Sequence, residues 1–209
     1  MKVLIVDDHA IVRRGMISLL QEHFKEVETG EAGDAREGLA AVNREDWDVA
    51  VVDISMPGRS GLDLIQDIKR EKPSLRVLVV SSQSEDDYAL RALKSGASGY
   101  VSKQSAPDIL VTAVERILSG RRFISAGLAE KLAGALAGDS PVTSHEALSN
   151  RELQVLQLIA SGKTIKEISS DLALSEKTVA TYRSRISEKM GLSTNVDLTR
   201  YAMQNGLVS

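Results

Sequence analysis

The sequence predicts a doubly wound α/β domain with a parallel five-stranded sheet, followed by an all-α domain of four short helices. Three runs are apolar at every position, VLIV at residues 3–6, VAVV at 49–52 and VLVV at 77–80, as strands buried on both faces should be. Amphipathic stretches separate these runs and suit right-handed crossover helices. The strand signals stop after Arg121, so the second part of the chain has a different fold class.

The elements of the α/β domain form a regular series along the chain. Two further strands are expected at residues 26–33 and 99–103, the first with Val27 as its only strongly apolar residue. Helices are predicted at residues 11–24, 61–70, 86–95 and 107–118. Strands that alternate with helices of this length form a parallel sheet.

An Ala/Gly/Leu-rich segment and a polar stretch containing Pro141 separate the two domains. Such composition is typical of a linker. We therefore predict the α/β domain at residues 1–121, a linker with a helical segment at 122–147, and the helical domain at 148–209.

The starts of the four C-terminal helices are marked by side chains that cap helices. Ser149, Thr164 and Thr194 each precede an acid by three residues, and Ser175 caps a further helix. The first three helices are joined by tight connections, SGKT and LALS, which is the spacing of a helix-turn-helix. This spacing indicates DNA binding.

Composition and charge exclude several classes of protein. No run approaches the roughly 18 apolar residues of a membrane span, and acids follow the N-terminus too closely for a signal peptide, so we expect no membrane contact and a cytoplasmic location. The absence of cysteine excludes disulfides, thiolate metal sites and a cysteine nucleophile. Residues 1–120 hold 15 basic and 20 acidic groups, whereas residues 146–209 hold 8 and 7 and include a locally basic helix at 176–189.

Functional groups of a parallel α/β sheet collect at the carboxyl ends of its strands. Asp7, Asp8, Asp53, Ser81 and Lys103 all fall at such ends. Carboxylates from two strands cannot share a small volume without a counter-charge, so a hard cation such as Mg²⁺ is expected between them. The lysine and the serine suit the oxygens of a transferring phosphoryl group, and Asp53 can then act as a nucleophile.

These residues resemble the receiver domain of bacterial two-component response regulators. The resemblance is carried by VDD at 6–8, DISMPGRSG at 53–61, Ser81 and YVSK at 100–103. It implies that Asp53 is the phosphoacceptor. The implied Mg²⁺ ligands are Asp8 directly, Asp7 through water, Asp53, and the main-chain carbonyl of Ser55. The implied phosphoryl-binding and switch residues are Lys103, Ser81 and Tyr100.

Four neighbouring residues are interpreted as structural. His9 follows the acid pair, but no second His or Cys lies at a ligand spacing, so we interpret His9 as the start of a helix. Met56, Pro57 and Gly61 are expected to shape the loop after Asp53.

The segment from Leu148 to Leu192 resembles the LuxR-type DNA-binding domain at the C-terminus of NarL/FixJ response regulators. By this resemblance the helix after Ser175 is the recognition helix, and the preceding helix faces the DNA backbone. The expected DNA contacts are Thr164, Lys166, Lys177, Thr181, Arg183, Ser184, Arg185 and Lys189. The expected core is Leu153, Leu156, Ile159, Ile165, Ile168, Leu172, Leu174, Val179, Ile186 and Met190.

The last amphipathic helix has Leu198, Tyr201 and Ala202 on one side. Relatives use this helix for dimerisation, and the alternative is a helix that covers the core of its own domain.

The main hypothesis is a transcription regulator that a sensor histidine kinase phosphorylates on Asp53, which in turn controls homodimerisation and binding to double-stranded promoter DNA. On this hypothesis the chain is not an enzyme with a separate substrate, although it promotes its own phosphorylation and dephosphorylation. Two alternatives stay open. One is a Mg²⁺-dependent phosphatase or phosphotransferase that acts through an aspartyl phosphate. The other is a DNA-binding partner protein that works unphosphorylated.

Overall fold

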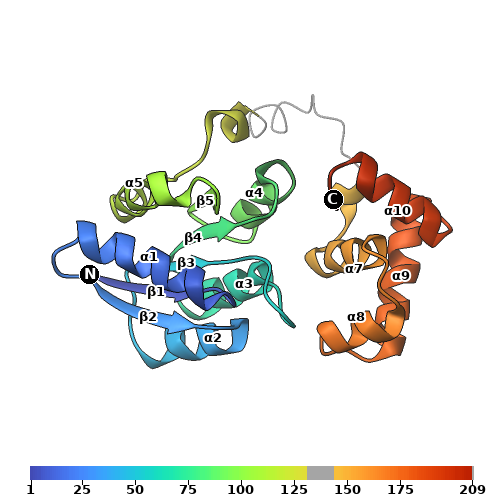
Figure 1. The fold of residues 1–209 in the computed structure, drawn as a ribbon, viewed down its shortest axis with the longest axis horizontal. Coiled ribbons are helices and arrows are strands. Elements are labelled where there is room, and N and C mark those ends of the chain that lie inside the picture. Colours follow the sequence, from blue (N-terminus) through green and yellow to red (C-terminus); the bar gives the residue numbers. More distant parts are fainter. Residues whose placement is uncertain (131–143, 209) are drawn as a thin grey trace. The chain divides into compact units, whose positions relative to one another are not determined.

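The computed structural model describes residues 1–130 and 144–208, and it divides the chain into two compact units, Met1–Gly138 and Asp139–Ser209 (Figure 1). Each unit is described by itself. Part of the predicted linker, residues 131–143, lies outside the described residues, so the limits predicted for it stay a prediction. Residues 126–130 are helical, within the predicted helical segment of the linker.

The first unit is built on a parallel sheet. Its strands are β1 (Lys2–Val6), β2 (Glu28–Ala32), β3 (Val49–Val52), β4 (Arg76–Ser81) and β5 (Gly99–Ser102). They lie in the order β2-β1-β3-β4-β5, which is a doubly wound order with a switch point between β1 and β3. The predicted fold class is therefore confirmed.

Helices cover both faces of this sheet (Figure 1). They are α1 (Ala10–His23), α2 (Ala35–Arg44), α3 (Gly61–Glu71), α4 (Glu85–Lys94) and α5 (Ala106–Leu118). Helices α1 and α5 contact each other over one face, whereas α3 lies beside both α2 and α4. The apolar strand runs are fully buried between these layers, because alternate residues point to opposite faces.

The edge strand β2 differs from the others because only Ala32 of its five residues is buried. It forms because it pairs with β1 in register from Lys2–Glu28 to Val6–Ala32. A Cβ atom at Gly30 would lie 2.3 Å from Cη2 of Trp47, so the indole ring packs directly on the strand backbone. This long-range contact explains why local hydropathy gave only a weak signal.

The chain returns to the opposite edge of the sheet after α5. Phe123 donates its N–H to the carbonyl of Ser98 at 3.0 Å, and Tyr100 donates its N–H to the carbonyl of Phe123 at 3.1 Å. The first residues of the predicted linker therefore extend the sheet of the first unit at β5.

Two glycines of this unit are expected to respond oppositely to alanine. A Cβ at Gly61 would lie 1.9 Å from the carbonyl oxygen of Asp53, whereas one at Gly15, inside α1, would meet nothing within 4 Å. Gly61→Ala should therefore lower the free energy of unfolding by about 3 kcal/mol, and Gly15→Ala should raise it by about 0.5–1 kcal/mol. Urea unfolding followed by the fluorescence of Trp47, the single tryptophan of the chain, measures both. Equal effects would show that the loop after Asp53 relaxes to admit a methyl group.

The second unit is helical. It contains the 3₁₀ helix η1 (Ser144–Ala147) and the helices α7 (Asn150–Ala160), α8 (Ile165–Asp171), α9 (Glu176–Met190) and α10 (Asn195–Gln204). Ser149 and Thr164 form reciprocal capping boxes with Glu152 and Glu167, as the sequence predicts. The four predicted helices and both tight connections are present.

Three of the predicted core residues of this unit are less buried than expected. Ile165 is exposed, so its assignment to the core is wrong, and Leu174 and Met190 are half-buried. Ile165 is the first residue of the short helix α8, in which only Ile168 is buried, so the apolar face of α8 is narrower than the sequence spacing suggests. No helix among the described residues has the length and hydropathy to cross a membrane.

Candidate functional site

The predicted acid cluster forms where β1 and β3 end. Asp7 and Asp53 are almost completely buried, with 0% and 2% of their surface exposed, and Asp8 is half-buried. One carboxylate oxygen from each of these three residues and one ring nitrogen of His9 lie within 4.8 Å of one another. This geometry brings together the three carboxylates that the sequence predicts.

Lys103 lies on one side of these carboxylates. Its Nζ is 2.7 Å from Oδ2 of Asp53 and 2.6 Å from Oδ2 of Asp7. Burial lowers the pKa of Lys103, but hydrogen bonds and charge attraction from Asp53 and Asp7 outweigh burial and raise the pKa above its ordinary value. The lysine therefore stays charged, and it compensates only one of the three negative charges.

Two carboxylate oxygens of the cluster have few partners within the protein and could bind a further cation. Oδ2 of Asp7 is buried and contacts only the Lys103 ammonium, and Oδ1 of Asp8 is buried and contacts only Nδ1 of His9, at 2.9 Å. Buried carboxylate oxygens that accept so few hydrogen bonds are unfavourable unless cations compensate their charge, and the Lys103 ammonium supplies one positive charge for three carboxylates. The donor set, all hard oxygen apart from His9, fits Mg²⁺.

The predicted switch residues Ser81 and Tyr100 are both buried and meet at Gln83. The N–H of Gln83 donates to Oγ of Ser81 at 3.3 Å, and the Tyr100 hydroxyl donates to the carbonyl of Gln83 at 2.8 Å. The side-chain amide of Gln83 donates to Oγ of Ser55 at 2.9 Å, which ties this loop to the loop after Asp53. Burial raises the pKa of Tyr100, so its hydroxyl keeps the proton that it donates.

Sequence reasoning missed two residues that support this site. Nothing in the sequence marks Gln83 as functional, because a Gln shortly after a strand is common in surface loops. Arg13 lies on α1 and donates from Nη1 to the carbonyl of Asp7 at 2.6 Å, while its Nε contacts Glu31 at 2.9 Å. The signal in the sequence that could have identified Arg13 is its position one helical turn after His9, next to the acid pair.

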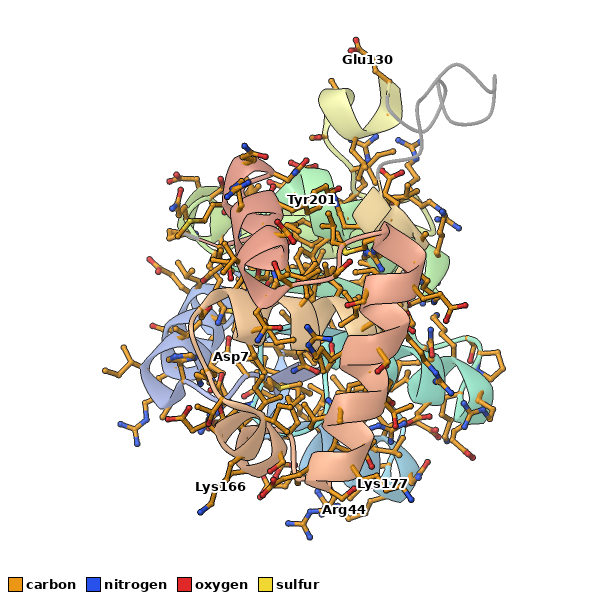
Figure 2. All side chains as sticks on the ribbon, turned by 90° about the vertical axis from the view of Figure 1, so that its right-hand side faces the viewer. Asp7, Arg44, Glu130, Lys166, Lys177 and Tyr201 are labelled. Atoms are coloured by element: carbon orange, nitrogen blue, oxygen red, sulfur yellow. The ribbon has the colours of Figure 1, made fainter. Side chains whose placement is uncertain are left out.

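Most of the predicted DNA-contacting residues lie exposed on α8 and α9. Lys166, Lys177, Thr181, Ser184 and Arg185 are exposed, as is Thr164, which caps α8. Figure 2 shows the Lys166 side chain extending from the first turn of α8 and Lys177 at the first turn of α9. Lys166, Lys177 and Arg185 form no ion pair within the part of the chain that is described, so these cations are available to a polyanion.

Two other predicted DNA contacts are engaged inside the unit. Arg183 donates from Nε to Oδ1 of Asn195 at 2.9 Å and from Nη2 to the carbonyl of Ser193 at 3.0 Å, which fixes the turn before α10. Nζ of Lys189 lies 2.6 Å from Oε2 of the buried Glu152. Burial raises the pKa of Glu152, but hydrogen bonds from Lys189 and Ser149 outweigh burial and lower the pKa, so the pair is ionised.

The residues predicted for dimerisation face the interior of their own unit. Leu198 and Ala202 are fully buried, and the Tyr201 hydroxyl lies 2.9 Å from Nδ1 of His145. The alternative interpretation, a helix that covers its own core, therefore describes these side chains. The exposed apolar residues of α10 are Val196 and Met203, and a dimer contact on this helix stays a prediction.

Comparison with protein families and curated proteins covers both units. The family described as response regulator receiver domain matches residues 3–115, and the family described as bacterial regulatory proteins, luxR family, matches residues 146–202. Response regulator GacA of Pseudomonas aeruginosa is 36% identical over 211 residues, covering 99% of this chain and 97% of the relative. Response regulator UvrY of Escherichia coli is 33% identical over 206 residues, covering 98% and 94%.

Solved structures of RcsB from Salmonella resemble the whole chain. One RcsB structure has a TM-score of 0.75 and 30% identity, covering 98% of this chain and 97% of RcsB. RcsB bound to promoter rprA in the presence of the phosphomimetic BeF₃⁻ has a TM-score of 0.69 and 31% identity, covering 96% and 98%. Taken with the acid cluster and the helix-turn-helix, these similarities confirm both resemblances: the chain belongs to the two-component response regulators of the NarL/FixJ group, with a receiver domain followed by a LuxR-type DNA-binding domain.

Proposed function

We propose that this regulator accepts a phosphoryl group from a sensor histidine kinase on Asp53, and that phosphorylation controls dimerisation and promoter binding. The observation that carries the proposal is the position of Asp53, a buried carboxylate 2.7 Å from the Lys103 ammonium in a cluster with Asp7 and Asp8. A buried cluster of three carboxylates and one lysine is weak support for stability, because apolar residues often replace buried ion pairs without loss, so the arrangement favours a chemical role for Asp53.

The chemistry is a displacement at phosphorus. A carboxylate oxygen of Asp53 attacks the phosphorus of the donor, a phosphorus–oxygen bond forms, and the bond to the donor atom breaks with its electron pair going to the donor. Lys103 holds an oxygen of the transferred group, and the Ser81 hydroxyl donates to another. Asp7, Asp8, Asp53 and the Ser55 carbonyl would hold Mg²⁺, which when bound neutralises charge between the carboxylate and the incoming phosphoryl group.

The response begins at the hydrogen bonds around Gln83. In the structure Oγ of Ser81 accepts the N–H of Gln83, and the Gln83 carbonyl accepts the Tyr100 hydroxyl. When the Ser81 hydroxyl turns to a phosphoryl oxygen, the loop that holds Tyr100 loses one of its attachments. A local charge thus biases a loop with two arrangements, which is the general form of a phosphorylation switch.

The output is promoter binding by the second unit. Helix α9 would enter the major groove, with Lys177, Thr181, Ser184 and Arg185 toward the DNA, while Thr164 and Lys166 at the start of α8 contact phosphates. Arg183 and Lys189 contribute only if they leave their partners inside the unit. The solved structures of RcsB bound to promoter rprA and of two RcsB dimers bound to two parallel DNAs support DNA binding as a dimer here.

The enzyme alternative has no support of its own, because it leaves the second unit without a role. The hypothesis of a partner protein that works unphosphorylated gives no role to the pair of Asp53 and Lys103, which is intact in this chain. Intact-mass measurement with a phosphodonor tests the input of the proposed function, and DNA titration tests its output.

The salt dependence of DNA binding should distinguish Lys177 from Lys189. Lys177→Ala should flatten the plot of log affinity against log salt by about one unit, because one phosphate contact is lost. Lys189→Ala should leave that slope unchanged and instead lower the free energy of unfolding by about 1–3 kcal/mol, because the buried Glu152 loses its partner. Fluorescence anisotropy titrations at several salt concentrations and thermal unfolding by circular dichroism measure the two effects. Equal flattening by both variants would assign Lys189 to the DNA surface as well.

A further inference from the structure

His9 places an imidazole against the acid cluster. Its Nδ1 lies 2.9 Å from Oδ1 of Asp8 and 3.3 Å from Oδ1 of Asp7, and its main-chain N–H donates to the same Asp7 oxygen at 2.8 Å. The side chain is 63% exposed, so the ring lies on the solvent side of the buried carboxylates. The ring nitrogen thus lies next to one carboxylate oxygen of Asp7 and one of Asp8.

The role of His9 at the start of α1 does not explain why its imidazole ring contacts the acid cluster. His9 is the N-cap residue of α1, as the sequence predicts, but its side chain makes no capping hydrogen bond. Only the backbone of His9 therefore contributes to the start of α1, and the imidazole contacts Asp7 and Asp8 instead.

Lys103 and His9 contact different oxygens of the shared carboxylate. Lys103 contacts Oδ2 of Asp7 and Oδ2 of Asp53, whereas His9 contacts Oδ1 of Asp7 and Oδ1 of Asp8. The cluster consequently has a lysine side and an imidazole side. A cation on the imidazole side would meet one nitrogen donor together with the carboxylates.

We propose that His9 is a further ligand of the cation site and shifts its preference from Mg²⁺ toward transition-metal dications such as Mn²⁺. The inference rests on the proposed function, in that the acid cluster holds a dication. Carboxylate and carbonyl oxygens suit Mg²⁺, whereas imidazole nitrogen adds affinity for first-row transition metals and very little for Mg²⁺.

The competing possibility is that His9 acts as a protonated counter-charge for Asp7 and Asp8. A bound dication would then have to displace it, so its removal would strengthen the binding of Mg²⁺ and Mn²⁺ alike. A metal ligand behaves in the opposite way, because its removal weakens Mn²⁺ binding selectively. The sign of the change therefore separates the two roles.

Pulsed electron paramagnetic resonance of Mn²⁺ bound to the untagged full-length protein tests the proposal directly. The wild type should show hyperfine coupling from an imidazole nitrogen, and His9→Asn should not, while the Mn²⁺ affinity of the variant falls by about tenfold. Its Mg²⁺ affinity, measured by calorimetry, should change less than twofold. Asn is a preferred N-cap residue, so this variant keeps the start of α1, and His9→Ala gives a second removal of the ring.

The matched control is His23→Ala, which removes an exposed imidazole that contacts Glu115. It should leave the nitrogen coupling and both affinities unchanged. Asp8→Asn, which removes a carboxylate of the site itself, should weaken the binding of both dications.

The outcomes separate this inference from the proposed function. If Mn²⁺ binds in a manner that depends on Asp8 but shows no nitrogen coupling, or if both His9 variants bind both dications more tightly, the role of His9 as a ligand is overturned and the cation site remains. If neither dication binds in a manner that depends on Asp8, the cation site of the proposed function is overturned together with the inference.

Discussion

Asp53→Asn is expected to abolish phosphorylation of this protein. Wild-type protein incubated with Mg²⁺ and acetyl phosphate should gain the mass of one phosphoryl group, stable to acid and labile to base, and the variant should gain none. The reason is that Asn has no nucleophilic carboxylate oxygen, while its size keeps the contacts of the buried side chain. Intact-mass spectrometry before and after base treatment measures the result.

Two further variants show whether the loss is specific to the site. Asp8→Ala removes a proposed cation ligand and should also reduce phosphorylation strongly, without unfolding. Asp46→Asn removes an exposed carboxylate that contacts Lys72 instead, and its phosphorylation should match that of the wild type. Phosphorylation of Asp53→Asn to the wild-type extent would refute the assignment of the phosphoacceptor.

Phosphorylated protein should dimerise more readily than unphosphorylated protein and should bind two DNA half-sites about one helical turn apart more tightly than a single half-site. The expected gain in operator affinity is about 5- to 150-fold, the usual range of about 1–3 kcal/mol for coupling between two sites. Because coupling is reciprocal, operator DNA should favour the phosphorylated dimer by the same factor. Analytical ultracentrifugation and DNA titrations, with and without acetyl phosphate, measure both quantities.

Asp53→Asn serves as the control in this experiment, since the phosphodonor should leave its association and DNA affinity unchanged. A wild-type sample shown by mass to be phosphorylated, yet unchanged in both measurements, would contradict the coupling. The protein would then be better described as a DNA-binding partner whose receiver domain serves for association alone.

Much of the fold could be predicted because its signals are local. Strands buried on both faces need apolar residues at every position, as at residues 49–52, and helix starts need side chains that satisfy free N–H groups, as Ser149 and Thr164 do. The acid cluster was also predictable, because parallel strands bring their carboxyl ends to one edge of the sheet.

The sequence by itself determined the two fold classes, the order of the strands and, among the described residues, of every α-helix except α2, and the residue types that meet at the edge of the sheet. Only the tertiary structure decided which individual side chains are available for function. It pairs Lys189 with the buried Glu152, attaches Arg183 to the turn before α10 and buries Leu198. The periodicity of a helix shows which residues share a face, but whether that face meets water, a neighbouring helix or an opposite charge depends on residues distant in the chain that packing brings together.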